Sequence, residues 1–147
     1  MPKTSTRLWT IFCVVTLTLS SGLASDRVIR HLTLADVVYV IERAIGAPPV
    51  VRDWGLLESA VARPATVLFD HAIYPTLAEK AAALMHSLVS NHALLDGNKR
   101  AGFACAAVFC HINGHPLTMT QHDAYELTMR VARGELSDVK DIADQLK

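Results

Sequence analysis

The sequence predicts a single all-α domain, a compact bundle of about six helices. Three observations support this prediction. Apolar residues recur at helical spacing in successive segments, capping residues and Gly or Pro stops bound those segments, and strand-like alternation is nearly absent. With 147 residues, 51% of them hydrophobic, the chain is long enough to bury a core. Its seven glycines and six prolines are too few for a disordered chain.

Two helices are expected before residue 63. Thr33 can cap the first, which Gly46 and the prolines after it stop. Asp53 can cap the second, which runs through about Ala62. The polar residues at the start of this second helix are interpreted as a capping and solvated set and not as catalytic groups: Arg52, Asp53 and Glu58.

Residues 65–75 are less regular than the segments on either side of them. Val67, Leu68 and Phe69 can form a short extended segment. The residues alone predict an inter-helix loop here.

The next two helices are expected to form the centre of the bundle. Thr76 and Glu79 make a capping box that opens the third helix, which has wide apolar coverage and brings His92 to its C-terminal end. The following helix is expected over residues 100–113, with Gly114 as its stop. Its many small residues allow the two helices to pack closely.

Two further helices complete the predicted bundle. Thr120 and Asp123 suggest a capped helix that Gly134 closes, and Ser137 is expected to cap the last helix, over residues 138–145.

Charge and cysteine content limit the possible functions. The 14 basic and 14 acidic residues give a net charge of zero, so no direct nucleic-acid binding is expected from the chain alone. The cysteine count is odd, and Cys105 and Cys110 lie five residues apart in one apolar helix. This pattern indicates reduced thiols and not a disulfide framework.

Residues 92–100, His-Ala-Leu-Leu-Asp-Gly-Asn-Lys-Arg, concentrate polar chemistry between the two central helices. Gly97 permits a tight turn, after which the amides that start the next helix point outward and can bind an anion. Lys99 and Arg100 add positive charge at the same helix end, which disfavours the helix and favours phosphate. Asp96 can hold a magnesium ion, and His92 can take a proton near neutral pH.

An ordinary structural interpretation of these residues stays open. Asp96 and Gly97 are a common turn pair, residues 98–100 could be a solvated helix start, and His92 could lie at a helix end without a role. This interpretation explains poorly why two cations stand at a helix N-terminus.

The pattern His92-x-Leu94-x-Asp96-Gly97-Asn98-Lys99-Arg100 closely resembles the signature of the Fic/Doc family. Lysine at position 99 is the feature of the Doc (death-on-curing) branch, since the Fic branch has glycine there. Phe103, where the Fic branch usually has a second arginine, is again Doc-like. Leu94 replaces the phenylalanine common in the motif. The resemblance runs from about Val28 to Lys147.

The resemblance implies a fold and a set of residue roles. It implies a Fic/Doc-like helical fold with a short flap at residues 65–75, which would align the backbone of a target protein beside the site. It implies ATP and Mg²⁺ as cofactors and His92 as the catalytic base. The remaining site residues would hold the metal (Asp96) or bind the nucleotide phosphates (Gly97, Asn98, Lys99 and Arg100).

The resemblance also implies an activity. A Doc-type toxin transfers the γ-phosphate of ATP to a Thr or Ser hydroxyl of a protein, here expected to be elongation factor Tu, and so inhibits translation. Lys99 would crowd the pocket for the inner phosphates and supply a cation for a terminal one. A small Phd-type antitoxin would be the partner. Two alternatives stay open: an AMP transferase of the Fic type and a catalytically inactive or exported binding protein.

Residues 1–27 differ from the remainder of the chain. Lys3 and Arg7 precede an apolar run over residues 8–19, and small residues follow near Ala24, as in a secretory signal peptide. The run is short for a membrane span. Export would separate the protein from ATP, so the favoured explanation is a misplaced start, with the domain over residues 28–147 and a cytoplasmic location. A working signal or anchor is the alternative.

Overall fold

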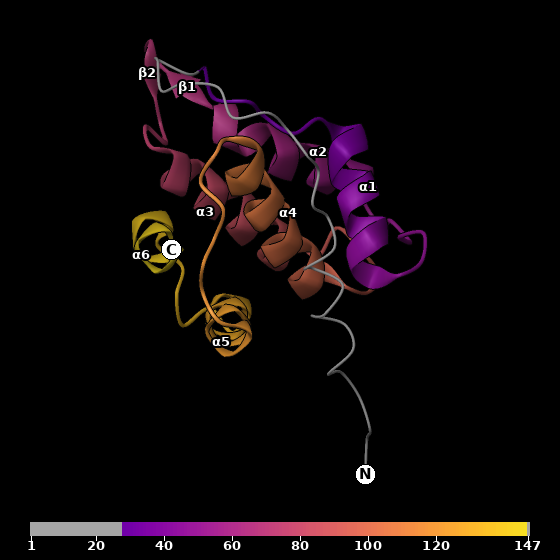
Figure 1. Ribbon diagram of the computed structural model, residues 1–147. Helices are drawn as coiled ribbons and strands as arrows, with labels where there is room; N and C mark the ends of the chain where they lie inside the picture. The colour runs from indigo at the N-terminus through magenta and orange to yellow at the C-terminus, as the bar shows by residue number, and fades with distance from the viewer. Residues whose placement is uncertain (1–27, 147) are drawn as a thin grey trace.

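The computed structural model describes residues 28–146, and helices α3 (Leu77–Ser90) and α4 (Asn98–Ile112) lie at the centre of this part (Figure 1). The two helices pack closely because Gly102 has no side chain: a Cβ there would overlap the side chain of Val89 and lie 3.1 Å from the Met85 carbonyl oxygen. The buried faces of both helices are rich in alanine. This close packing fixes the positions of the two helix ends that the intervening loop joins.

Helices α1 (Leu34–Ile45) and α2 (Trp54–Ala62) cover the central pair, α1 from the right and α2 from the top in Figure 1. Helix α1 begins with a capping box in which Thr33 and Asp36 satisfy each other's backbone amides. Asp53 accepts from the Leu56 amide at the start of α2, as the sequence predicts. A short 3₁₀ helix, η2 (Arg63–Ala65), follows.

A small hairpin, β1 (Val67–Leu68) and β2 (His71–Ala72), separates η2 from α3. The strands are antiparallel, with Val67 opposite Ala72 and Leu68 opposite His71. The extended segment expected near Val67 is therefore part of a two-stranded hairpin, at the place where the family resemblance implies a flap.

Helices α5 (Gln121–Ala132) and α6 (Val139–Gln145) close the other side of the central pair. The buried apolar residues of both helices join the same core as those of α3 and α4. The prediction of an all-α bundle of about six helices is thus confirmed.

The boundaries of two helices differ from the sequence prediction. Helix α4 begins at Asn98 instead of residue 100, so two residues of the expected loop belong to the helix. Asp138, and not Ser137, caps α6, because its carboxylate accepts from the amides of Lys140 and Asp141. A carboxylate oxygen can take both amide bonds, and the serine one residue earlier is not needed.

The signal-like segment, residues 1–27, lies outside the described residues. Within residues 28–146, no helix is both long and apolar enough to cross a membrane.

The two cysteines of α4 are free thiols. Both Cys105 and Cys110 are buried, in agreement with the expected reduced state.

Candidate functional site

The loop from Asn91 to Gly97 joins α3 to α4 and carries most of the predicted site. Helix α3 ends at Ser90, with Asn91 as its C-cap. His92 therefore lies two residues beyond the helix, just past the end at which the sequence places it. Its side chain is exposed, as are those of Asp96 and Lys99, so all three can reach a ligand.

His92 has an unusual backbone conformation. Its φ angle is +52°, in the left-handed region that only a few per cent of residues other than glycine adopt. The residue directly after a helix C-cap often adopts this conformation, and glycine usually occupies the position. A histidine there is strained by about 1–2 kcal/mol, and such strain persists where neighbouring contacts hold it.

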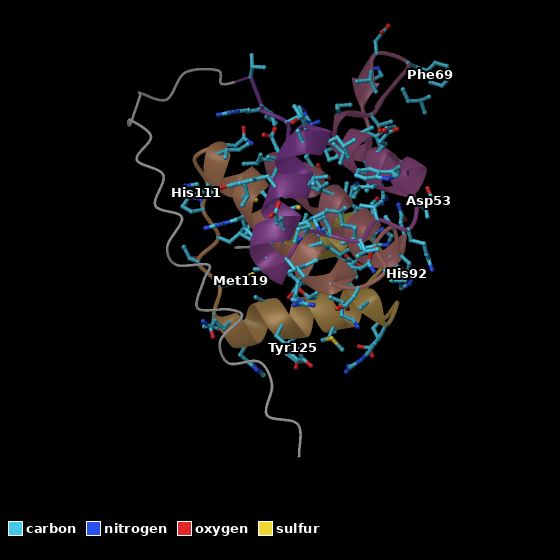
Figure 2. All side chains as sticks on the ribbon, turned by 90° about the vertical axis from the view of Figure 1, so that its right-hand side faces the viewer. Asp53, Phe69, His92, His111, Met119 and Tyr125 are labelled. Carbon is cyan, nitrogen blue, oxygen red and sulfur yellow. The ribbon has the colours of Figure 1, made fainter. Side chains whose placement is uncertain are left out.

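The connection between α1 and α2 supplies those contacts. Val51 and Leu94 form an antiparallel bridge, and the Leu95 amide donates to the Val50 carbonyl over 2.9 Å. The amides of Arg52 and Asp53 both donate to the Ala93 carbonyl, over 2.8 and 3.1 Å. Figure 2 shows Asp53 and His92 on the same side of the molecule. Residues 50–53 therefore support the loop.

Arg52 makes a further contact that sequence reasoning missed. Its Nη2 atom donates to the His92 carbonyl oxygen over 2.7 Å, a short and charge-assisted hydrogen bond. The sequence suggested only a solvated charge beside the Asp53 cap. No local pattern could have revealed this bond, because the two residues are 40 positions apart.

Asn98 closes the loop from its other end. Its side-chain carbonyl accepts from the Leu94 amide over 3.0 Å, and its side-chain amide donates to the Leu94 carbonyl over 2.9 Å. These two bonds use the side chain to shape the loop. The part of Asn98 that remains for an anion is its backbone amide at the helix start.

The start of α4 has the geometry of an anion-binding helix end. Gly97 has φ +87°, and the first intrahelical bond runs from the Ala101 amide to the Gly97 carbonyl over 2.8 Å. The amides of residues 98–100 precede that bond and have no intrahelical acceptor. A Cβ on Gly97 would overlap the side chain of Ile45, so both the conformation and the packing at this position require glycine.

The charged residues of the loop lie next to that helix start. Arg100 Nη2 lies 3.3 Å from Asp96 Oδ2, and the Asp96 side chain is 89% exposed. An exposed pair of this kind stabilises the fold little. The exposed carboxylate of Asp96 lies beside the outward-facing amides of α4. Its oxygens are the ligands that a hard cation such as Mg²⁺ prefers. The described residues therefore fit a phosphate group with its magnesium ion.

The hairpin has different properties from the loop. Phe69 and Asp70 at its turn have φ angles of +48° and +62°, and Phe69 is 87% exposed. A two-residue turn with both φ angles positive suits a hairpin, but Asn-Gly is the usual sequence. Figure 2 shows Phe69 at the hairpin tip, apart from the body of helices. The hairpin thus exposes apolar side chains on a protruding element.

Arg63 anchors the base of the hairpin to α3. It donates from Nε to the Tyr74 hydroxyl (2.7 Å) and from Nη1 to Ser87 Oγ (2.9 Å). Nη1 also lies 3.0 Å from His86 Nδ1, which must accept because a guanidinium only donates. Burial, and secondarily the charge of Arg63, lower the pKa of His86 and so favour this neutral acceptor.

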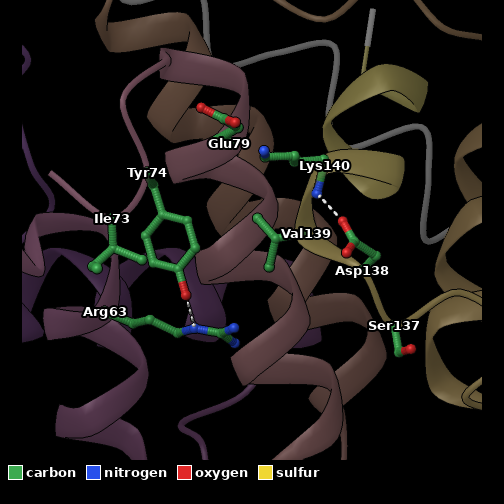
Figure 3. A pocket seen from close by; sticks show the side chains of 8 residues that line it. All are labelled: Arg63, Ile73, Tyr74, Glu79, Ser137, Asp138, Val139 and Lys140. Atoms are coloured by element: carbon green, nitrogen blue, oxygen red, sulfur yellow. Dashed lines mark hydrogen bonds between the residues drawn. The ribbon is translucent and has the colours of Figure 1, made fainter.

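A cavity of about 380 Å³ lies at the opposite end of α3 from His92 (Figure 3). Two carboxylates in its wall are occupied by capping: Glu79 accepts from the Thr76 amide, and Asp138 from the Lys140 amide. A helix of 14 residues is roughly 21 Å long, so this cavity is far from the loop. We therefore place the candidate site at the loop, where an exposed imidazole (His92), an exposed carboxylate (Asp96) and the start of α4 lie close together in the chain.

Comparison with known proteins identifies the family to which the chain is similar. The model of the Fic/DOC family matches residues 28–110, more than half of the chain and the whole region from the first described residue into α4. Toxin Doc of Mycolicibacterium smegmatis (strain ATCC 700084 / mc(2)155) is 50% identical over 85 residues. These residues cover 58% of this chain and 65% of the relative, so the chain spans less than two thirds of that relative's length.

Proposed function

Because the chain belongs to the Fic/DOC family, we propose that it is a Doc-type toxin kinase that transfers the γ-phosphate of ATP to a Ser or Thr hydroxyl of a protein. The similarity to Toxin Doc supports the toxin role. The expected target is elongation factor Tu, and the expected effect is an arrest of translation in the cytoplasm.

One observation carries the proposal. The loop between α3 and α4 holds an exposed histidine and an anion-binding helix start within a few residues, and contacts from residues 50–53 and Asn98 hold that loop in place. Phosphoryl transfer depends mainly on positioning and on stabilisation of charge, so a preorganised loop suits it.

The proposed reaction is a single transfer. The target hydroxyl oxygen forms a bond to the γ-phosphorus, and its proton goes to His92. The bond between the γ-phosphorus and the β–γ bridging oxygen breaks, and its electron pair leaves with ADP. Throughout, the amides of residues 98–100 and the side chains of Lys99 and Arg100 bind the phosphate oxygens.

Magnesium and ATP are the proposed cofactors. Asp96 would hold the ion through its exposed carboxylate, and the ion would neutralise charge on the phosphates. Gly97 would contribute the tight turn that precedes the helix start, because its φ of +87° and its packing against Ile45 leave no room for a side chain.

Lys99 decides between the two branches of the family in this proposal. Its side chain is exposed at the second position of α4, where a cation can meet a terminal phosphate. The AMP-transferring alternative requires the inner phosphate at that place, and a lysine would crowd it.

A Phd-type antitoxin is the proposed partner, which would neutralise the toxin by binding near the site. The exposed apolar residues around the loop suit a protein contact: Val50, Trp54 and Leu95.

The proposal is tested with the purified chain, elongation factor Tu, Mg²⁺, and ATP labelled at either the α or the γ position. Label on the target from γ alone supports the kinase. Label from α would identify an AMP transferase. No label from either position, with a folded protein that also fails to bind Mg-ATP, would contradict enzymatic function at this site.

A further inference from the structure

We propose that Arg52 is a positioning residue, which holds the backbone of His92 in its left-handed conformation and thereby orients the imidazole. The kinetic consequence rests on the function proposed above, whereas the conformational claim is independent of it.

The first step of the argument concerns what would happen to His92 without help. At the position after the α3 C-cap, a non-glycine residue with φ +52° is disfavoured relative to ordinary φ values. A change of φ at His92 would swing its Cβ and its ring away from the helix start of α4. The placement of the ring therefore depends on whatever holds this backbone.

The second step concerns which contacts hold it. The neighbouring carbonyl, that of Ala93, is bound by two backbone amides, which persist whatever side chain stands at position 52. The carbonyl of His92 itself is bound by the side chain of Arg52 at 2.7 Å. Among the described residues, this bond is the contact that acts on the His92 backbone and can be removed by one substitution.

The third step concerns why an arginine suits this place. Helix α3 ends two residues before His92, and the C-terminal end of a helix carries partial negative charge. A cation there is stabilised, and its hydrogen bond to a carbonyl is stronger than a neutral one. A guanidinium also keeps a fixed planar geometry, whereas lysine offers a flexible point charge.

The conformational claim is tested by substituting Arg52 in two backgrounds. In the original chain, Arg52→Ala should lower the unfolding midpoint and shift the carbonyl and amide NMR signals of His92 and Ala93. In the His92→Gly background the same substitution should lower the midpoint by more, because glycine has no strain to relieve and loses the full hydrogen bond, whereas histidine recovers part of the loss by relaxing to an ordinary φ. Arg133→Ala, which removes only a surface ion pair with Glu135, is the control and should leave those signals unchanged.

Equal destabilisation in both backgrounds would overturn the proposal, because Arg52 would then be a structural contact unrelated to the conformation of His92. Unchanged His92 signals in Arg52→Ala would overturn it as well.

The kinetic consequence is measured on phosphoryl transfer. Arg52→Ala should lower kcat about tenfold to a hundredfold, as expected for a misplaced catalytic group, with KM for ATP nearly unchanged. Arg52→Lys should restore part of kcat. If Arg52→Ala shifts the His92 signals but leaves kcat intact, orientation of the ring by Arg52 is refuted. If the original chain transfers no phosphate, the proposed function fails, and the NMR and two-background results still decide the conformational claim.

Discussion

The loop between α3 and α4 and the hairpin before α3 both contain non-glycine residues with positive φ, but the chain supports them in opposite ways. The strained His92 lies in a loop bound by residues 50–53 on one side and by Asn98 on the other. The strained turn at Phe69 and Asp70 protrudes, and its strands pair with each other.

This difference separates two tasks. Strain that many contacts hold is suited to keeping catalytic groups in one geometry. Exposed apolar side chains at a protruding hairpin tip are suited to binding another protein. The base of the hairpin is nevertheless attached to α3, because Arg63 hydrogen-bonds to both His86 and Ser87. The predictions below separate the two regions, from the largest expected effect to the smallest.

The strongest test of the loop is His92→Ala. If His92 is the base that we propose, its loss should lower phosphoryl transfer by about 10²- to 10⁴-fold, while ATP binding measured by calorimetry stays nearly the same. His111→Ala, an exposed histidine at the far end of α4, is the matched control and should keep full transfer. Normal turnover in His92→Ala would remove His92 as the base.

Lys99→Ala tests the charge at the helix start. Alanine keeps the helix, so folding should be preserved. Transfer of the γ-phosphate should fall about tenfold or more, because the cation that we propose meets the transferred group is lost. Lys99→Gly should lower transfer of the γ-phosphate at least as much, and in our proposal it should also allow some transfer of AMP. Unchanged kinase activity in both variants, measured with γ-labelled ATP, would contradict the role assigned to Lys99.

Gly97→Ala tests how tightly the loop is packed. Gly97 and Gly134 both have positive φ, but a Cβ meets Ile45 at the first and open space at the second. Gly134→Ala should lower the free energy of unfolding by about 1–2 kcal/mol through strain alone. Gly97→Ala should lower it by about 1–3 kcal/mol more, because the loop cannot move away from α1. Equal losses in urea unfolding would show that the loop yields as easily as a surface turn.

The corresponding change in the hairpin should have a smaller effect of the opposite sign. Replacing Phe69-Asp70 by Asn-Gly supplies the preferred residues for this turn, so stability should rise by up to about 1 kcal/mol. ATP binding should not change, and thermal unfolding measures the gain. A marked loss of stability would mean that the Phe69 ring packs against the fold, contrary to its exposure.

The weakest effect is expected from the anchor between the two regions. The folded-state pKa of His86 is lowered from 6.5, first by burial and then by Arg63, so the unfolded chain binds its proton at higher pH than the folded one. The neutral His86 therefore contributes its full stabilisation above about pH 6.5, and this contribution is lost as the pH falls through the pKa of the folded state. The pKa of His31 is also lowered, by burial and by the charge of Lys80, so His31 acts in the same direction.

His86→Gln should therefore reduce the rise in unfolding free energy between about pH 5 and about pH 7 without abolishing it, since His31 remains. Exposed His122→Gln is the control and should leave the slope as it is. An unaltered slope in His86→Gln would show that the anchor does not depend on a neutral imidazole.

Local signals predicted most of the fold and the outline of the candidate site. The cap Thr33 and the capping box of Thr76 and Glu79 identify two helix starts, and the composition around Gly97 identifies the loop. The start of α4 was misjudged because Asn98 has a side chain that favours caps and turns, whereas here it clasps Leu94 from inside the helix. The bridge between Val51 and Leu94 is a long-range contact with no periodicity to reveal it.

The contact between Arg52 and His92 also depends on the order in which the chain is synthesised. Arg52 leaves the ribosome 40 residues before His92, about 2–8 s earlier at ordinary rates of synthesis. Residues 50–53 are thus already present when the loop is synthesised. The remaining entropic cost is that of closing the chain between the two segments. A chain interrupted before α4 would contain the histidine and its support without the helix start that we propose binds the phosphates, so the proposal predicts that such a truncated chain transfers no phosphate.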